Sequence, residues 1–348
     1  MQIIKPGINL NIIGKSKIVF SLSMALIVIS ILSLIFHKGP RYGIDFSGGT
    51  LIQIKFGGPA TIDAIKSGLK AMNLANASVQ TFGEESENEY LVRTDASADM
   101  DEAFSSKLKS ALDSATQNES EIRRVEMVGP QVGKDLQEKA LFAIFYTLLF
   151  IAIYISGRFE LKWVISGVMA AALTGAVYLF SLFQVSVAFL IAVALIVTLI
   201  LFWVLSLRYA MGAIVALIHD ITITVGLFSL MEKEFSLPII AALLTIIGYS
   251  LNDTIIVFDR IRENLKKYHK ESLAFIINRS INETLSRTIL TSLTTLIVVF
   301  SLFVLGGGII HDFAFALLIG IVIGTYSSIY VASPILLFWE ARGRRASG

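Results

Sequence analysis

Hydrophobic and polar positions divide the chain into a single apolar run, a long polar block and a closely spaced series of apolar runs. The single run covers about 18–36, and the polar block extends from there to about 139. The later runs cover about 140–156, 163–183, 185–207, 210–231, 237–258, 286–305 and 313–339. A helix that crosses a bilayer needs about 20 apolar residues. The pattern therefore predicts a polytopic α-helical membrane protein with eight spans.

The composition also indicates a membrane environment. Hydrophobic residues make up 55% of the chain, charged residues make up 16%, and the mean hydropathy is +0.72, whereas soluble domains carry about 25% charged residues. The sequence has no cysteine, which excludes a disulfide scaffold and a Cys-based zinc site. A net charge of +2 argues against nucleic-acid binding, because phosphate contacts need a basic surface. Membrane lipid is therefore an expected partner, nucleic acid is not, and no cofactor is expected.

Basic residues predict the orientation of the spans, because short cytoplasmic loops are enriched in Lys and Arg. They gather at Lys5–Lys17, Arg158–Lys162, Arg208, Arg260–Lys270 and Arg342–Arg345. All of these lie on one side if every apolar run crosses the membrane once. We therefore expect a multi-pass protein of the cell inner (plasma) membrane, with both termini cytoplasmic and the polar block on the periplasmic side.

These assignments divide the chain into four parts. Residues 1–36 form the cytoplasmic N-terminus and the first span, 37–139 an exported domain, 140–339 the membrane bundle and 340–348 a cytoplasmic tail. The expected elements of the exported domain are a strand at 44–56, a helix at 61–72, strands at 77–82 and 90–94 around a turn at 83–86, a helix at 100–112 and a strand at 122–128. This β-α-β-β-α-β order is typical of a ferredoxin-like α+β fold.

Two adjacent glycines, Gly48 and Gly49, interrupt the first expected strand. A phosphate-binding loop would need a following GK[ST] sequence and a helix, and neither is present. A β-bulge or a close approach of two backbone segments is the better interpretation. Residues 41–130 of this domain also contain no histidine, so we expect no His-based catalysis there.

Polar residues within the apolar runs are the main functional candidates, because charges inside a membrane are costly. They are His219, Asp220, Asn252, Asp253, Arg287 and Thr288. A carboxyl group away from water favours its neutral form, and a nearby guanidinium favours its charged form. If Asp253 faces Arg287 at the start of its span, the carboxyl can take up and release a proton as the geometry changes. A structural ion pair that holds two helices together is the alternative, and the other four residues are candidates for lining the path.

Two enzymatic interpretations of these residues are weak. The His219-Asp220 dipeptide could belong to a metal-dependent hydrolase, but no further His or Asp ligands lie nearby, and such sites need more ligands. Asp220 and Asp253 could form an aspartyl protease dyad, but the sequence has no GxGD segment and the two carboxylates start at different depths. We expect no metal, no catalytic residue and no enzymatic activity.

Seven short segments spread along the chain carry a family resemblance. They are Gly43–Thr50, Val128–Gly133, Arg158–Glu160, Gly212–Asp220, Tyr249–Glu263, Ser280–Thr288 and Gly324–Ser328. Taken together and in this order, they resemble the SecF family, whose members work with SecD beside the Sec protein-conducting channel.

The resemblance implies half of an RND-type transporter, with six spans and an exported domain between the first two. SecD supplies the other half, and the pair uses the proton-motive force to assist a preprotein through the SecYEG channel. Within the family, the carboxylate of the Asn-Asp-Thr segment and the arginine of the Ser-Arg-Thr segment serve proton passage. These positions are Asp253 and Arg287 here.

One segment departs from the family pattern. The family continues almost directly from the Arg158–Glu160 segment to the Gly212–Asp220 segment, whereas about 50 residues intervene here. They hold two extra spans, an inserted hairpin at about 163–207 without a charged residue, which we expect at the edge of the bundle. Two other functions remain open: an RND-type transporter of small molecules, and a passive assembly subunit of the translocase.

Overall fold

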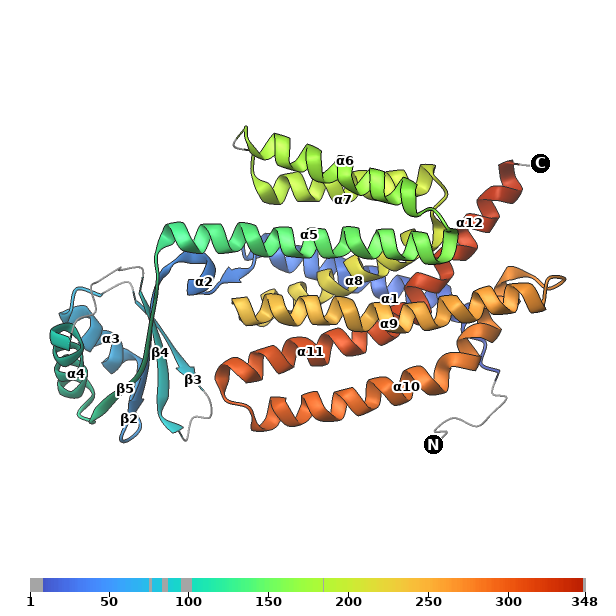
Figure 1. Ribbon diagram of the computed structural model, residues 1–348. Helices are drawn as coiled ribbons and strands as arrows, with labels where there is room; N and C mark the ends of the chain where they lie inside the picture. The colour runs from blue at the N-terminus through green and yellow to red at the C-terminus, as the bar shows by residue number, and fades with distance from the viewer. Residues whose placement is uncertain (1–8, 75–76, 83–86, 95–101, 184, 347–348) are drawn as a thin grey trace.

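The protein is a long helical bundle with a small α+β unit at one end (Figure 1). The computed structural model describes residues 9–74, 77–82, 87–94, 102–183 and 185–346. Within these residues, 8 helices are long and apolar enough to cross a membrane. The expected polytopic helical membrane fold is confirmed.

The bundle is built from long helices joined by short connections. They are α1 (Ser16–Phe36), α5 (Pro130–Glu160), α6 (Trp163–Ser181), α7 (Val187–Val204), α8 (Arg208–Leu230), α9 (Leu237–Lys267), α10 (Leu273–Leu305), α11 (Gly308–Ser327) and α12 (Ser333–Ala346). A 3₁₀ turn, η1 (Ile13–Lys15), precedes α1. Proline in the first turn starts α5 and α9, where its missing N–H has no cost. Ser272 caps α10 by accepting a hydrogen bond from the Phe275 N–H at 3.3 Å.

Several helices differ in extent from the apolar runs. α5 begins ten residues before the run expected at 140, α9 continues past 258 to Lys267, and α10 begins at Leu273 rather than 286. Hydropathy marks only the part of a helix that is apolar, and a helix can continue beyond it on polar residues. The last run is not one α-helix, because a π-turn, η3 (Ser328–Ala332), separates α11 from α12.

The α+β unit contains one four-stranded antiparallel sheet with the order β3-β4-β2-β5. Its elements are β2 (Gly49–Phe56), α3 (Ile62–Ala71), β3 (Ser78–Phe82), β4 (Glu89–Thr94), α4 (Glu102–Thr116) and β5 (Ser120–Val128). Alternate residues of β2 and β4 are buried because only one sheet face packs on the two helices. Ile52, Val92, Ile65 and Leu112 belong to that core. This strand order is that of the expected ferredoxin-like fold. The turn expected at 83–86 and the first residues of the helix expected at 100–112 lie outside the described residues.

The segment between α1 and β2 differs from the expected strand. Its first residues form a short helix, α2 (Ile44–Ser47), and the strand begins only at Gly49. Before it, β1 (Arg41–Tyr42) pairs in parallel with β6 (Glu234–Phe235), the strand that precedes α9. Such a short pairing, made across a large sequence separation, has no signal in hydropathy.

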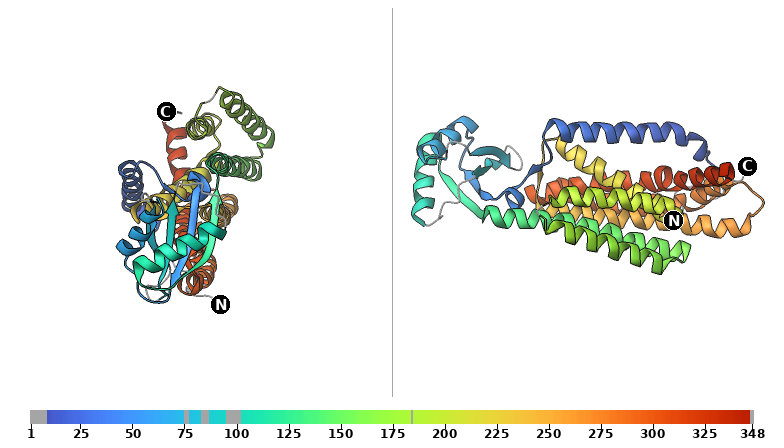
Figure 2. Two further views of the ribbon diagram at one scale, coloured as in Figure 1. Left: turned by 90° about the vertical axis from the view of Figure 1, so that its left-hand side faces the viewer. Right: turned by 90° about the horizontal axis from the view of Figure 1, so that it is seen from above.

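α8 occupies the middle of the bundle, where it packs against α1, α5, α9 and α11. The first half of α8, including Tyr209, Ala213 and Leu217, belongs to the largest apolar cluster, which also contains Phe145 and Phe258. The hairpin α6–α7 packs mainly on α5, with further contacts from α7 to α8, and lies at one side of the bundle (Figure 2).

Candidate functional site

Asp253 lies where α9, α10 and α11 meet. Its side chain is fully buried, and Oδ2 accepts a hydrogen bond from the Ser292 hydroxyl at 3.5 Å. Ser292 is also 2.7 Å from the Thr325 hydroxyl. The other carboxylate oxygen, Oδ1, and the nearby Thr288 hydroxyl are buried without a hydrogen-bond partner among the described residues. The carboxyl group therefore sits among hydroxyls but is only partly satisfied, which is unusual for a buried polar group.

Arg287 lies in the middle of α10, because this helix begins at Leu273, well before the apolar run expected at 286–305. Its side chain is exposed, and its guanidinium forms no ion pair in the described part of the chain. It nevertheless interacts electrostatically with the Asp253 carboxyl. Asn252 is exposed as well. The structure thus buries Asp253 and Thr288 and leaves Asn252 and Arg287 on the surface of the single chain.

His219 and Asp220 form a second polar cluster in the middle of α8. His219 Nδ1 lies 2.9 Å from Asp220 Oδ1, and His219 Nε2 lies 3.1 Å from the Ser23 hydroxyl of α1. Asp220 Oδ2 accepts hydrogen bonds from Ser250 of α9 at 2.6 Å and from Ser327 of α11 at 2.8 Å. All five side chains are buried. This cluster is a closed network that joins four helices.

The network extends along α1 through a tyrosine. The Ser23 hydroxyl is 2.8 Å from Tyr326 Oη, and that phenol donates to the Val19 carbonyl at 2.7 Å. Asp220 therefore differs from Asp253 in a chemically important way: both of its oxygens have partners. The arrangement suits Asp220 to holding helices together and Asp253 to changing its partners.

Sequence reasoning did not identify the hydroxyl partners of either carboxylate. None of them carries a charge that marks it within an apolar run; they are Ser250, Ser292, Thr325 and Ser327. Their role depends on which helices pack together. Helical spacing is no guide either, because Ser250 and Asp253 lie on neighbouring positions of one helix face, yet the Ser250 hydroxyl donates to Asp220 of α8.

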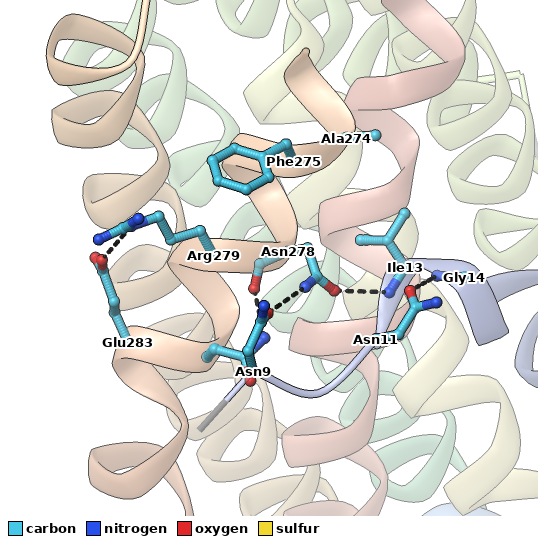
Figure 3. Close-up of a pocket in the computed structure, with 10 residues that line it drawn as sticks. Asn9, Asn11, Ile13, Gly14, Ala274, Phe275, Asn278, Arg279 and Glu283 are labelled. Atoms are coloured by element: carbon cyan, nitrogen blue, oxygen red, sulfur yellow. Dashed lines mark hydrogen bonds and ion pairs between the residues drawn. The ribbon is translucent and has the colours of Figure 1, made fainter. Parts of the chain in front are cut away.

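A separate pocket of about 710 Å³ lies between the N-terminal segment and the start of α10 (Figure 3), at the end of the bundle away from the α+β unit (Figure 1). Its asparagines hold the N-terminal segment against α10. Asn278 Oδ1 accepts from the Ile12 N–H at 2.9 Å, and the Asn278 and Asn282 amides each donate to the Leu10 carbonyl at 3.0 Å. None of the residues predicted from the sequence lines this pocket, and its polar groups serve chain packing.

The described residues contain no group of three or more His, Cys, Asp or Glu side chains that could hold a metal ion. The polar groups near Asp253 are hydroxyls and one exposed guanidinium. Such a set can accept, hold and release a proton.

Family models identify the chain. The model of the protein export membrane protein SecD/SecF, C-terminal, matches residues 107–200 and 174–342, and the SecD/SecF GG motif matches residues 33–60. The chain belongs to the SecD/SecF family. The motifs named from the sequence lie largely within these matches, and the predicted family is confirmed.

Relatives agree with this assignment. The protein translocase subunit SecF of Calditerrivibrio nitroreducens is 41% identical over 99% of both chains. That of Vibrio alginolyticus is 42% identical over 97% of this chain and 91% of its own. The SecD/SecF proteins are protein-export components, and this chain is a multi-pass membrane member of that family.

Two solved structures share the fold. The crystal structure of SecDF from Thermus thermophilus, a translocon-associated membrane protein, gives a TM-score of 0.75 at 30% identity and covers 96% of this chain. SecDF in its super-membrane-facing form gives a TM-score of 0.64 at 31% identity and covers 100%. The chain spans 39% and 40% of those two longer chains.

Proposed function

We propose that the chain is the SecF subunit of a SecD–SecF complex that uses the proton-motive force to assist preprotein translocation through the SecYEG channel. The observation that carries the proposal is the Asp253 carboxyl, which is buried between three helices and has one oxygen without a partner among the described residues. A buried carboxyl binds a proton more readily when its charged form lacks hydrogen bonds. Helix movement that brings donors to Oδ1 would favour release of the proton.

Arg287 completes the relay in this proposal. Its guanidinium interacts with Asp253 without an ion pair at contact distance in the described residues. A shift of α10 against α9 would therefore strengthen or weaken that interaction without breaking a tight bond. Thr288, one residue further on, has an unpartnered buried hydroxyl and would donate to or accept from the carboxyl as its charge changes.

SecD is the partner that we place on the outer face of α9 and α10. Asn252 and Arg287 are exposed on these two candidate membrane-spanning helices, and contact with lipid is costly for polar side chains. The matching SecDF chains are more than twice as long as this one, so a second half is available in those proteins to cover such a face.

The proposal includes the orientation of the chain in the membrane. Both termini are cytoplasmic, and the domain at 37–139 is periplasmic. The α+β unit and the start of α1 lie at opposite ends of the bundle (Figure 1), and Arg260–Lys270 extends beyond the apolar part of α9 at the end near the start of α1. Short loops rich in Lys and Arg favour the cytoplasmic side.

Proton flux through the purified SecD–SecF complex in sealed vesicles tests the relay. With an imposed pH gradient, we expect Asp253→Asn to abolish the flux, because Asn keeps the shape of the side chain but cannot titrate. Asp253→Glu should retain part of it. Asp63→Asn makes the same exchange at an exposed position of α3 and serves as the matched control.

Undiminished flux in the Asp253→Asn complex would contradict the relay. If that complex also supported normal translocation, Asp253 would be a structural residue and the chain a passive assembly subunit. A complex that moved small molecules across the vesicle membrane without SecYEG would instead favour an RND-type transporter.

A further inference from the structure

The first turn of α9 is capped by a residue from a distant part of the chain. The Asp45 carboxylate accepts a hydrogen bond from the Leu237 N–H at 2.8 Å. The local cap position, Ser236, makes no side-chain hydrogen bond, and Pro238 has no N–H. The first N–H groups of a helix have no partner within the helix. Asp45 therefore supplies the side-chain cap that α9 lacks in its own sequence.

The same segment is joined to the chain before α9 through its backbone. The Gly43 N–H donates to the Phe235 carbonyl at 2.7 Å, and β1 pairs with β6 directly beside it. A side chain at Gly43 would approach the Phe235 carbonyl to 3.1 Å. Segment 41–45 and the start of α9 are thus held together by backbone pairing and by one carboxylate.

On its other side, the segment packs against the start of α5. Gly48 has a φ of +73°, and a Cβ there would lie 2.7 Å from Pro130 Cα. A Cβ on Gly133 would lie 2.9 Å from the Gly48 nitrogen. The two backbones therefore touch directly. This close approach explains why glycine is required at Gly48, which the sequence reading left as one of two interpretations.

An arginine ties the sheet of the α+β unit to the same place. Arg93 of β4 donates to the Tyr42 carbonyl at 2.7 Å and lies 3.4 Å from Glu234 Oε1, with a further hydrogen bond to Ser47. The α+β unit, α5 and α9 thus meet at segment 41–48, which we term the joint.

We propose that Asp45 is a positioning residue that couples movement of the α+β unit to Asp253 through α9. This inference rests on the proposed function. Asp253 is 16 residues from Leu237 in one continuous helix, about 24 Å along its axis at 1.5 Å per residue. A displacement of the capped first turn moves the helix as a rod and changes the position of the Asp253 carboxyl relative to Ser292 of α10.

Separate measurement of proton flux and of translocation tests this coupling. Vesicles containing SecYEG and the SecD–SecF complex are assayed for both, with the preprotein supplied on the cytoplasmic side. We expect Asp45→Ala to keep wild-type flux while gradient-dependent translocation falls by about fivefold or more. Asp45→Asn keeps a side-chain oxygen that caps helices well, so it should restore translocation.

A second pair of variants tests the joint independently of the carboxylate. Gly133→Ala forces a methyl group against the Gly48 backbone, whereas a Cβ on Gly129 meets nothing within 4 Å. We expect Gly133→Ala to lower translocation with flux retained, and Gly129→Ala to behave as wild type.

Wild-type translocation in both Asp45→Ala and Gly133→Ala would overturn the inference, and so would equal loss of flux and translocation. A wild-type complex that conducts no protons would overturn the proposed function itself. The absence of proton flux would be seen in the wild-type complex, before any variant of the joint is compared. Failure of the proposed function can therefore be distinguished from failure of the coupling inference.

Discussion

Asp220 and Asp253 are both fully buried carboxylates, yet their surroundings differ. Asp220 is contacted by His219 and accepts from two serine hydroxyls at 2.6 and 2.8 Å. Asp253 has one contact, at 3.5 Å, and one oxygen without a partner in the described residues. Since removal of one member of a buried polar cluster leaves the others unpaired, the two residues should contribute very differently to stability.

We therefore expect Asp220→Ala to lower the free energy of unfolding by about 3–5 kcal/mol, and Asp253→Ala to lower it by much less. Asp220→Ala leaves the His219 ring without its carboxylate partner and the Ser250 hydroxyl without its acceptor, and Ser327 keeps only the Gly324 carbonyl at 3.1 Å. Asp253→Ala removes a poorly satisfied group. Denaturant unfolding of the purified protein in detergent measures both. Equal losses for the two variants would show that the Asp220 network does not hold the bundle together.

The sequence was sufficient to select the two carboxylates but not their environments. Charge within an apolar run marks Asp220 and Asp253 whatever the fold, because its cost depends only on the membrane. The partners of each are uncharged hydroxyls on other helices, and only packing decides which ones meet. Hydropathy begins the seventh run next to Arg287 and does not register the polar first turns of α10 that precede it.

At the scale of elements, α1 is held by small side chains rather than by apolar ones. Its buried residues are Ser23, Ser30 and Ser33, and Ser33 donates to Ser229 of α8 at 3.0 Å. A Cβ on Gly226 of α8 would lie 2.1 Å from the Ser30 Cβ. Small residues let membrane helices approach closely, so this seam fixes the distance between α1 and α8.

Gly226→Val should consequently push α1 away from α8. The chain has no cysteine, so Ser33→Cys with Ser229→Cys introduces a single pair whose disulfide reports the seam. We expect efficient cross-linking in the otherwise native chain and a clear loss with Gly226→Val. Gly248→Val is the matched control, since nothing lies within 4 Å of a Cβ there; equal cross-linking in both valine variants would contradict the close seam.

The apolar runs predicted the long helices well, because a membrane demands about 20 apolar residues wherever a helix crosses. The strands expected at 44–56 and 90–94 overlap β2 and β4. The elements that were missed are those fixed by tertiary contacts: α2 at Ile44–Ser47 and the pairing of β1 with β6. Each is only two to four residues long, too short for any periodic pattern. These same elements build the joint, so the coupling between domain and bundle could not be read from the sequence.

At the scale of the whole molecule, the bundle separates two chemically different ends. One end carries the α+β unit and the joint, and the other carries the pocket formed by the N-terminal segment and α10 (Figures 1 and 3). Asp253 lies between them on α9, which begins at the joint and ends among basic residues at Lys266 and Lys267. A proton taken up on one side and released on the other would pass the residue that this helix positions.

The arrangement predicts which end faces the cytoplasm. Asp63 on α3 and Lys267 at the end of α9 are both exposed and lie at opposite ends of the molecule (Figure 1). In intact spheroplasts, a membrane-impermeant maleimide should label Asp63→Cys at once and Lys267→Cys only after the membrane is disrupted, because basic segments stay on the cytoplasmic side. The cysteine-free wild type gives the background. Labelling of Lys267→Cys in intact spheroplasts would contradict this orientation and place the α+β unit inside the cell. There it could not act on a preprotein that has crossed the membrane.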